Sequence, residues 1–416
     1  MSTNAKDPVV VVGAGIVGVC CALYLLREGR RVVLVDRGAP GEGTSFGNGS
    51  VITEEAVIPV QSPGVAWQVP GMLMDPLGPL ALRWSYLPQI APWLYHFIRA
   101  STPERVEEVS IALRSLLKGA LAAYDPLLEA AGIRDMIRRS GWVSVYETEA
   151  GFRRYERKLE LQRRRGVNLE VIQPEEIRQL EPSLAPIFHR GVFYPDVAHT
   201  VNNYRFVTEL AGTFQRLGGE ILRQTVVGFE QDDGGVRAVV TEAGVIACSG
   251  IVLAAGAWSK PLAAMLGSPA LLDTERGYHL TLPHAGAELR LPVYSTERGF
   301  VCTPLENGLR IAGTVELGGL HAAPNWQRAE VLYRNASRWF PGLDRREQSL
   351  WMGYRPSMPD SVPVIGRSPR HRNAIFAFGH GHIGLSLGAR TAVLVAALLA
   401  ERDPGIDMAP YRVDRF

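Results

Sequence analysis

The feature that most constrains this chain is the segment V-V-V-V-G-A-G-I-V-G at residues 9–18. Its four consecutive valines predict a short strand that is buried on both faces of a parallel sheet. Gly13 permits a tight turn after the strand, Gly15 lets a pyrophosphate approach the backbone, and Gly18 lets a helix pack closely on the strand. The sequence therefore predicts a helix over residues 16–27 whose positive end faces phosphate groups.

The second half of this unit ends in an acidic residue. Gly29 ends the predicted helix, residues 31–35 are expected to form the next strand, and Asp36 closes that strand. A carboxylate at this place accepts hydrogen bonds from ribose hydroxyls and repels a 2′-phosphate. The pattern favours an unphosphorylated dinucleotide and leaves NAD and FAD open. The residues expected to contact it here are Gly13, Gly15, Ile16, Val17, Asp36 and Arg37.

Length, charge and cysteine spacing restrict the other classes. A chain of 416 residues exceeds the length of about 250–300 residues at which one core stops growing, so two domains are expected. The net charge of +2 gives no electrostatic reason to expect binding to nucleic acid. The four cysteines show no C-x-x-C spacing, which favours a reducing cytoplasm and predicts neither a metal site nor a disulfide framework. Residues 1–8 lack the pattern of a secretory signal peptide. The apolar segment 391–400 is expected to be a buried helix, because it is too short to cross a bilayer.

Residues 38–53 form a glycine-rich stretch that is either a flexible linker or a ligand-lining loop. A Phe in mid-loop, Phe46, favours the second interpretation because linkers rarely carry one. We expect contacts with the second phosphate and the ring system from Thr44, Ser45, Asn48 and Gly49.

Residues 61–100 are rich in Trp, Pro and Leu, a composition typical of short helices broken by proline. A lid, a docking surface, a peripheral contact with the inner face of a membrane and an insertion packed on the core all remain open. Further along, helical spacing predicts helices over 104–131, 151–165, 174–180, 203–217 and 331–340.

The strand and glycine-turn pattern recurs twice. Residues 251–259, I-V-L-A-A-G-A-W-S, predict a buried strand that breaks at Gly256, next to the dinucleotide. Residues 375–388 repeat strand, glycine turn and helix. We also expect contacts with the cofactor from Val226, Val227, Ala255, Gly256 and Trp258. The predicted fold class is α/β with an α+β second domain: a discontinuous Rossmann-like domain from 1–60, 195–270 and 350–416, and a mixed-sheet domain with a helical insertion from 61–194 and 271–349.

Taken together, the motifs resemble the flavoprotein family of D-amino-acid dehydrogenases and oxidases, with glycine oxidase and sarcosine oxidase as relatives. The resemblance covers the whole chain and rests on G-A-G-I-V-G with Asp36, T-S-F-G-N-G, A-A-G-A-W-S, R-G-Y-H-L-T-L (276–282), G-Y-R-P-S-M-P-D-S-V-P-V-I-G (353–366) and G-H-G-H-I-G-L-S-L-G (379–388). It implies FAD and dehydrogenation of a D-amino acid or cyclic imino acid, with hydride transfer from Cα to flavin N5. The T-S-F-G-N form resembles the dehydrogenases, which pass electrons to a quinone or another acceptor.

Oxidation at Cα needs a hydride acceptor, a cation that fixes the substrate carboxylate and a neutral amine. The family's carboxylate arginine matches Arg355, whose planar guanidinium suits a carboxylate, although an exposed surface pair is the alternative. The turn before the last helix would face the flavin edge where negative charge develops. This turn contributes Gly381, His382, Gly384 and Leu385 to the predicted cofactor site. His380 is a further candidate for a catalytic role. In relatives, the residues that match Tyr278 and His279 lie over the substrate. Because side chains alternate along a strand, only one of the two can face the substrate, and we favour Tyr278. Thr53 and Tyr294 are weaker candidates.

Departures from the family pattern bear on cofactor attachment and substrate. Relatives with covalent flavin carry a Cys before P-D, whereas this chain has Met352 and Met358, so we expect non-covalent FAD. The segment A-H-T-V-N (198–202) is similar to the branch that acts on D-hydroxyproline, which makes D-hydroxyproline or D-proline the first candidate substrate. Two alternatives stay open: an oxygen-using oxidase of the glycine or sarcosine oxidase type, and an FAD-carrying subunit of a larger electron-transfer complex.

Overall fold

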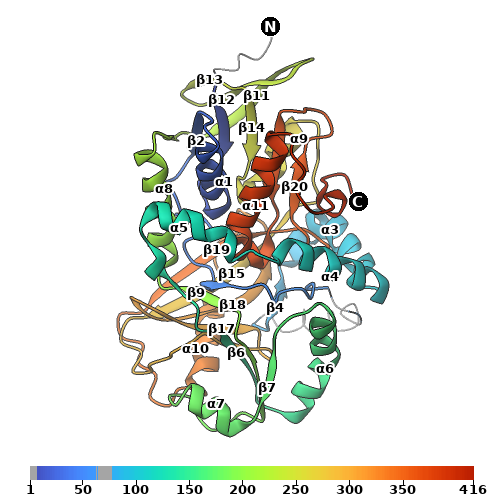
Figure 1. Cartoon of the computed structure of the whole chain (residues 1–416). Helices are drawn as coiled ribbons and strands as arrows, with labels where there is room; N and C mark the ends of the chain where they lie inside the picture. The colour runs from blue at the N-terminus through green and yellow to red at the C-terminus, as the bar shows by residue number, and fades with distance from the viewer. Residues whose placement is uncertain (1–6, 62, 64–76) are drawn as a thin grey trace.

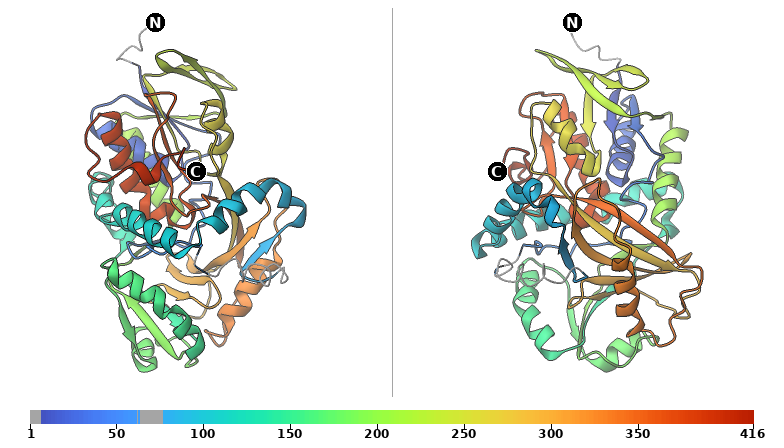
Figure 2. Two further views of the ribbon diagram at one scale, coloured as in Figure 1. Left: turned by 90° about the vertical axis from the view of Figure 1, so that its right-hand side faces the viewer. Right: turned by 180° about the vertical axis from the view of Figure 1, so that it is seen from behind.

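The computed structural model describes residues 7–61, 63 and 77–416. Two large sheets lie one above the other along the long axis of the molecule (Figure 1), and the same arrangement is seen from the side and from behind (Figure 2). The upper sheet contains the glycine-rich unit at the N-terminus. The segment 64–76, part of the Trp- and Pro-rich stretch whose role was left open, lies outside the described residues.

The upper sheet has six strands. Their order is β10 (Glu220–Arg223), β2 (Val32–Asp36), β1 (Val9–Val12), β14 (Gly250–Leu253), β21 (Ala374–Phe378) and β20 (Val364–Arg367). All neighbours are parallel except β20 and β21. The valines of β1 alternate between two hydrophobic clusters, Val9 and Val11 on one face and Val10 and Val12 on the other. An uninterrupted apolar run is therefore needed, because both faces of this strand are covered.

The two faces of the upper sheet have different covers. One face packs against α1 (Ile16–Arg27), α5 (Asp125–Ala131), α8 (Asn203–Arg216) and α11 (Gly384–Leu399). The other packs against a small antiparallel sheet and one helix: β11 (Val226–Asp232), β12 (Gly235–Thr241), β13 (Gly244–Ala247) and α9 (Ser259–Met265). These layers hold the glycine turns at one end of the sheet.

The lower sheet has nine strands and is mixed. Along its path lie β19 (Ser349–Ser357), β15 (Asp273–Leu282), β18 (Gly308–Leu317), β17 (Phe300–Leu305), β16 (Val293–Ser295), β6 (Trp142–Tyr146), β8 (Arg190–Tyr194) and β7 (Glu170–Ile172), and β4 (Leu80–Leu82) pairs with β18. The β4–β18 and β6–β16 pairs are parallel and the others are antiparallel. The helices α7 (Pro174–Leu180) and α10 (Gln327–Ser337) and buried Trp339 pack on the face turned away from the upper sheet.

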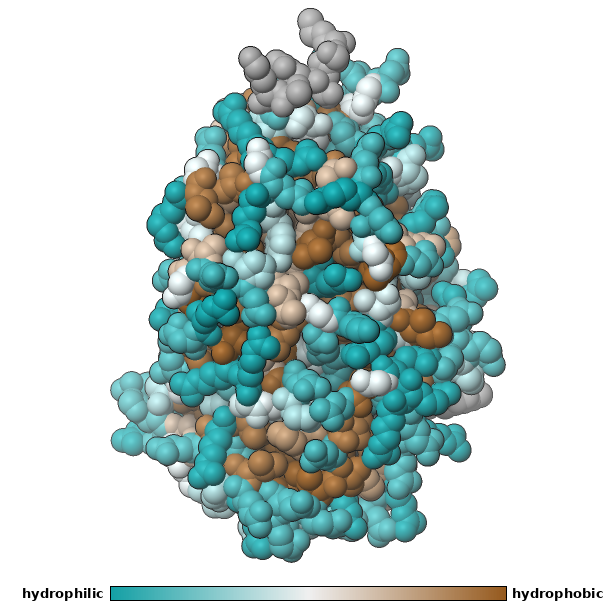
Figure 3. Space-filling model, viewed as in Figure 1, coloured by the Kyte–Doolittle hydropathy of each residue, from teal (hydrophilic) through white to brown (hydrophobic). Residues whose placement is uncertain are grey.

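The remaining elements flank these layers. A three-stranded sheet joins β3 (Val51–Ile52), β9 (Ala198–Thr200) and β5 (Ile137–Arg138). The helices α3 (Leu87–Arg99), α4 (Pro103–Leu117) and α6 (Glu149–Arg164) lie on the right-hand side of the molecule in Figure 1. On the face shown in Figure 3, hydrophilic side chains cover most of the surface, with smaller apolar groups between them.

Several elements differ from the sequence prediction. The helix over 16–27 is confirmed with the same bounds. The helix expected over 104–131 is wrong: α4 ends at Leu117 and α5 starts at Asp125, because Gly119 adopts φ +78° and a proline occupies the first turn of α5. The strand expected over 251–259 already ends at Leu253, and Gly256 begins a short 3-10 helix.

The last helix begins at Gly384, directly after the glycine turn as expected, so it extends well before the apolar segment 391–400. Together with the turn before it, the helix forms the stretch Gly381–Leu399. Among the described residues this is the one helix long and apolar enough to cross a membrane, and 56% of its apolar 18-residue stretch is buried inside the molecule. Its apolar side chains pack in the cluster that also contains α1, which accounts for the composition of the helix.

We propose that the domain boundaries follow the two sheets, with two changes from the expected ranges. Residues 349–357 go with the lower sheet, because β19 pairs with β15 along its whole length. Residues 121–137 go with the upper sheet, because Leu121, Tyr124 and Leu127 are buried among side chains of α1 and α11.

Candidate functional site

A large cavity of about 1710 Å³ lies between the two sheets. Ligand pockets usually measure about 300–1,000 Å³, so this one has room for a large ligand and a small one together. Its walls come from the glycine turns of the upper sheet, the 38–53 loop, and β6, β15 and β19 of the lower sheet. Segments far apart in the sequence thus share one site.

The first glycine turn has the geometry that a bound diphosphate requires. Gly13 has φ +110°, and a Cβ there would lie 2.4 Å from the Ala254 carbonyl oxygen. A Cβ at Gly18 would lie 1.8 Å from the Gly13 carbonyl oxygen. Residues 13–17, at the positive end of α1, line the cavity. The turn therefore brings bare backbone and a helix N-terminus to the cavity wall, which suits an anionic ligand.

Asp36 lies at the end of β2 on the cavity wall. Its Oδ2 accepts a hydrogen bond from the Ala14 N–H at 2.7 Å, and its Oδ1 accepts one from the Gly38 N–H at 2.8 Å. Each carboxylate oxygen has a further lone pair with which to accept a ribose hydroxyl. Beside it, the Arg37 guanidinium lies 4.0 Å over the ring of Trp258, and both residues line the cavity.

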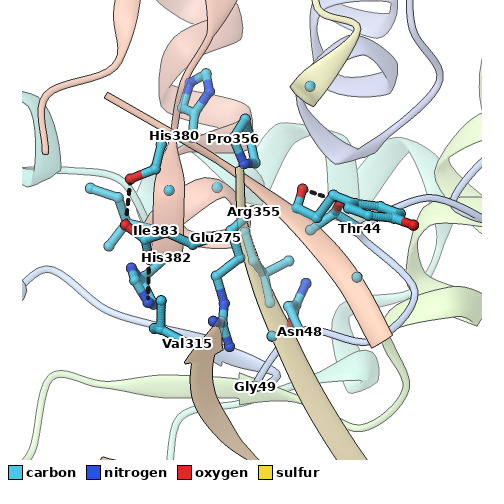
Figure 4. A pocket seen from close by; sticks show the side chains of 18 of the residues that line it. Thr44, Asn48, Gly49, Glu275, Val315, Arg355, Pro356, His380, His382 and Ile383 are labelled. Carbon is cyan, nitrogen blue, oxygen red and sulfur yellow. Dashed lines mark hydrogen bonds and ion pairs between the residues drawn. The ribbon is translucent and has the colours of Figure 1, made fainter. Parts of the chain in front are cut away.

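The 38–53 loop lies along the cavity wall and is held by hydrogen bonds to other parts of the chain. Ser45 Oγ accepts from the Ile16 N–H at 2.9 Å, and Thr44 Oγ1 donates to the Tyr354 carbonyl at 2.7 Å (Figure 4). Asn48 Oδ1 accepts from the Asn203 side-chain amide at 2.8 Å. Thr44, Ser45, Asn48 and Gly49 all line the cavity. The segment is a fixed wall and not a flexible linker.

The second glycine turn leads into α11. Gly379 and Gly381 adopt φ +81° and +52°, and residues 379–386 line the cavity. His380 is buried, its Nε2 lies 3.0 Å from Thr391 Oγ1, and burial lowers its pKa to about 3. The ring is therefore a neutral part of the wall that is fixed to α11. The expectation of a catalytic role for His380 remains a prediction without support from this geometry.

Arg355 enters the cavity from β19 and lies against a glycine of β15. Its Nη1 donates to the Thr314 carbonyl at 2.9 Å, and a Cβ at Gly277 would lie only 2.2 Å from its Cζ. In the described part of the chain this is the one hydrogen bond of the guanidinium, so further donors are available to a ligand. Burial lowers the pKa of Arg355, and the negative charge of Glu275 opposes this effect. The alternative of an exposed surface pair is wrong, because the guanidinium lies inside the cavity (Figure 4).

Glu275 and His382 accompany Arg355 (Figure 4). Glu275 Oε1 accepts from Ser357 Oγ at 2.7 Å, and His382 Nε2 lies 3.4 Å from Glu275 Oε2. Burial lowers the pKa of His382, while Glu275 acts in the opposite direction. The buried cation is thus balanced by a carboxylate on the neighbouring strand.

Three predicted site residues lie outside the cavity wall. The Tyr278 hydroxyl donates to Glu316 Oε2 at 2.5 Å and the ring is in the core of the lower domain, because alternation along β15 turns Glu275 and Gly277 toward the cavity. His279 stacks on Trp351, with its Nδ1 2.9 Å from the Gly47 carbonyl oxygen, so the 38–53 loop separates it from the cavity. Val227 is 45% exposed, because only its neighbour Val226 faces the cavity.

The remaining residues that were predicted to contact the cofactor line the cavity. They are Ala255, Gly256, Trp258, Gly381, His382, Gly384 and Leu385. So do the weaker candidates Thr53 and Tyr294. The four cysteines are buried and none belongs to the cavity wall. Among the described residues, no group of three or more His, Cys, Asp or Glu side chains is placed to hold a metal ion.

Sequence reasoning missed one wall of the cavity. Trp142, Ser144 and Tyr146 line it from β6, while Val143 and Val145 between them are in the core of the lower domain. The signal was present in W-V-S-V-Y, where aromatic and polar residues alternate with valines. Glu55 also lines the cavity, two residues after Thr53.

The comparison with known families decides what this arrangement is. Residues 8–398 match the sequence model of a family described as FAD dependent oxidoreductase. The chain belongs to this family of FAD-dependent oxidoreductases. The predicted family, fold class and cofactor are thereby confirmed.

Relatives and solved structures of FAD-dependent oxidoreductases extend over the full chain. A protein of Bradyrhizobium diazoefficiens named D-amino-acid oxidase is 41% identical over 98% of each chain. A D-amino acid dehydrogenase of Paramagnetospirillum magneticum is 33% identical, again over 98% of each. L-proline dehydrogenase from P. horikoshii has a TM-score of 0.77 at 20% identity, covering 99% of this chain and 98% of its own. Glycine oxidase from Geobacillus kaustophilus has a TM-score of 0.76 at 20% identity, covering 98% of both. These two structures support the fold.

The cavity fits FAD on the evidence of its own walls. Two glycine turns, from opposite ends of the chain, bring helix N-termini to one space, and the Asp36 carboxylate lies where a ribose would bind. In FAD-dependent enzymes the flavin supplies the hydride acceptor. We propose that the residues of α1, Asp36, Arg37 and Trp258 hold the adenosine diphosphate part, and that the 38–53 loop and the start of α11 hold the ring.

Proposed function

We propose that this FAD-dependent oxidoreductase dehydrogenates a D-amino acid at Cα. The observation that carries the proposal is the Arg355 guanidinium, which lines the cavity, has one hydrogen bond to the described part of the chain and lies against the bare backbone of Gly277. The D configuration and the amino-acid class are inferred from the two relatives named D-amino-acid oxidase and D-amino acid dehydrogenase, at 41% and 33% identity. The flavin is held without a covalent bond to cysteine, since all four thiols are buried away from the cavity.

Each polar group near Arg355 has a simple task in this proposal. Arg355 binds the substrate carboxylate through two parallel hydrogen bonds, which fixes Cα in one place. Glu275 keeps the guanidinium balanced when no substrate is bound. His380 and His382 are neutral walls, since burial lowers both pKa values. The apolar helix α11 excludes water from behind the site.

The test is anaerobic mixing of the FAD-loaded protein with enantiomer pairs of amino acids. We expect D-amino acids to bleach the flavin absorbance and their L-enantiomers to leave it unchanged, because one hand alone places the Cα hydrogen toward the ring while its carboxylate is on Arg355. Flavin that stays oxidised with every D-amino acid and secondary amine in the panel would refute the proposal.

The electron acceptor separates two versions of this function. The T-S-F-G-N motif supports a dehydrogenase that reduces a quinone or another acceptor. The name of the relative at 41% identity supports an oxygen-using oxidase as the second candidate. Hydrogen peroxide formed at the rate of substrate loss would establish the oxidase, whereas turnover only with an added acceptor would establish the dehydrogenase. Turnover of either kind by the isolated chain would argue against a subunit that works only inside a larger electron-transfer complex.

D-hydroxyproline and D-proline stay a prediction. Their motivation was A-H-T-V-N at 198–202, and none of these residues lines the cavity; His199 is buried beside Ser140, with 3.0 Å between Nδ1 and Oγ. Both imino acids belong in the anaerobic panel.

For location we propose the cytoplasm, with peripheral contact to the inner face of the membrane through residues 84–98, where Trp84, Tyr95 and Ile98 are exposed.

A further inference from the structure

One part of the cavity is a compartment with aromatic walls. Trp142 stacks on Tyr294, with ring centroids 5.3 Å apart and planes 13° apart, and lies 6.1 Å from Tyr194. Tyr146 lies 5.7 Å from Tyr155, which belongs to α6. All five rings line the cavity. The β6–β8 and β6–β16 pairings fix three of them, because Trp142 pairs with Tyr194 and Ser144 pairs with Tyr294. The compartment is therefore rigid.

A carboxylate, that of Glu55, lines the cavity beside these rings. Glu55 Oε2 accepts a hydrogen bond from the Gln162 side-chain amide at 2.8 Å, and the same amide donates to the Glu55 carbonyl at 3.2 Å. The Tyr194 hydroxyl donates to Gln162 Oε1 at 3.0 Å, which fixes the orientation of the amide. Burial raises the pKa of Glu55 to about 7, against the hydrogen bonds from Thr53 and Gln162.

Glu55 has no cation of its own. In the part of the chain that the structure describes, no Lys, Arg or His side chain forms an ion pair or hydrogen bond with it. A half-buried carboxylate without a partner of opposite charge carries a desolvation cost that a ligand cation can offset. Aromatic rings around such a group stabilise a cation further through their π faces.

Arg355 and Glu55 line the same cavity, and the ring of Tyr294 lines it with them. Tyr294 lies within electrostatic range of both: burial raises its pKa to about 12, the charge of Glu55 raises it as well, and Arg355 lowers it. A ligand that spans the ring of Tyr294 would therefore meet a guanidinium at one end and a carboxylate at the other.

We propose that Glu55 selects substrates whose side chain ends in an amine or a guanidinium, the carboxylate of the same molecule being held by Arg355. This inference rests on the proposed function for the identity of the carboxylate partner. The aromatic walls of Trp142, Tyr146 and Tyr294 enclose the methylene chain between the two charged ends. The enzyme then acts on basic D-amino acids, with Glu55 as the residue that sets side-chain preference.

The opposite preference, for an acidic side chain, would need a cation in the compartment. Lys158 and Arg154 are the basic residues on that side, and both belong to α6. Lys158 Nζ lies 4.7 Å over the ring of Tyr155, and Arg154 is exposed. Lys158 is half-buried and burial lowers its pKa, which disfavours its charged form, so we expect both residues to contribute less than Glu55.

The experiment measures binding of carboxylates that lack an α-amine and thus cannot be oxidised. Isothermal titration of the FAD-loaded enzyme with 5-guanidinopentanoate, octanoate and suberate compares a cationic, a neutral and an acidic far end on similar chains. We expect 5-guanidinopentanoate to bind about 10–100-fold more tightly than octanoate, the range for a hydrogen-bonded charge. Glu55→Gln keeps the oxygen that accepts from Gln162 and removes the charge, so this ratio should fall close to one.

Glu54→Gln is the matched control. Glu54 is the neighbouring acid, its Oε1 accepts from the Leu121 N–H at 3.3 Å, and it does not line the cavity. This variant should keep the wild-type ratio. Tighter binding of octanoate or suberate by the wild-type enzyme would overturn the proposal without any variant, as would a ratio that Glu55→Gln leaves unchanged. Because the ligands are not substrates, a preserved ratio in an enzyme that oxidises no D-amino acid would refute the proposed function alone.

Discussion

Replacing Arg355 by alanine should lower kcat/KM for the amino-acid substrate by about three orders of magnitude while the protein keeps its FAD. Each hydrogen bond between charged groups contributes about 1.5–3 kcal/mol, and the proposed carboxylate contact has two of them. Loss of both corresponds to about 10²–10⁴-fold in rate. Steady-state kinetics gives the first quantity, and the flavin-to-protein absorbance ratio gives the second.

Two further variants sharpen this test. Gly277→Ala introduces a Cβ only 2.2 Å from the Arg355 Cζ, so it should displace the guanidinium and reproduce part of the loss with the charge still present. Arg345→Ala removes a partly exposed guanidinium paired with Glu330 and should change neither quantity. An Arg355→Ala protein that had lost its flavin but bound substrate normally would show that Arg355 serves the cofactor instead.

Replacing Gly13 by alanine should weaken FAD binding by at least about 100-fold. The new Cβ would lie 2.4 Å from the Ala254 carbonyl oxygen, in a turn whose φ of +110° alanine rarely adopts. The turn must then move, and with it the backbone that approaches the diphosphate. Titration of the apoprotein with FAD, followed by the flavin fluorescence, measures the dissociation constant.

Gly212→Ala is the comparison for this variant. Gly212 is inside α8, where a Cβ would meet only Arg216 Nη1 at 3.4 Å. Alanine should be accepted there and slightly favour the helix. If the Gly13→Ala protein bound FAD as tightly as the Gly212→Ala protein, the first glycine turn would not be the diphosphate site.

The dinucleotide part of the site could be predicted from the sequence because its signals are local. Val9–Val12, Gly13 and Asp36 belong to one continuous unit in which each residue type answers a geometric need of the turn or the strand. The helix over 16–27 has the predicted bounds for the same reason. Such short-range patterns do not depend on how the rest of the chain folds.

The substrate side was harder to predict because its residues come together only through strand pairing. Tyr278 was favoured over its neighbours, but the register of β15 turns Glu275 and Gly277 toward the cavity. The choice between two faces of a strand depends on which sheet covers it, and a one-residue error moves every side chain to the other face. Glu55 gave no signal alone, since its role depends on contact with Gln162, over a hundred residues away.

The central claim is that two glycine turns from opposite ends of the chain hold one FAD, with Arg355 facing the space for a substrate carboxylate. A crystal structure of the FAD-loaded protein with benzoate, a carboxylate without an oxidisable Cα, tests it most directly. We expect the diphosphate at the start of α1, and the benzoate carboxylate within hydrogen-bond distance of the Arg355 guanidinium. Benzoate held elsewhere, or a flavin that does not touch the turn at 379–384, would contradict it.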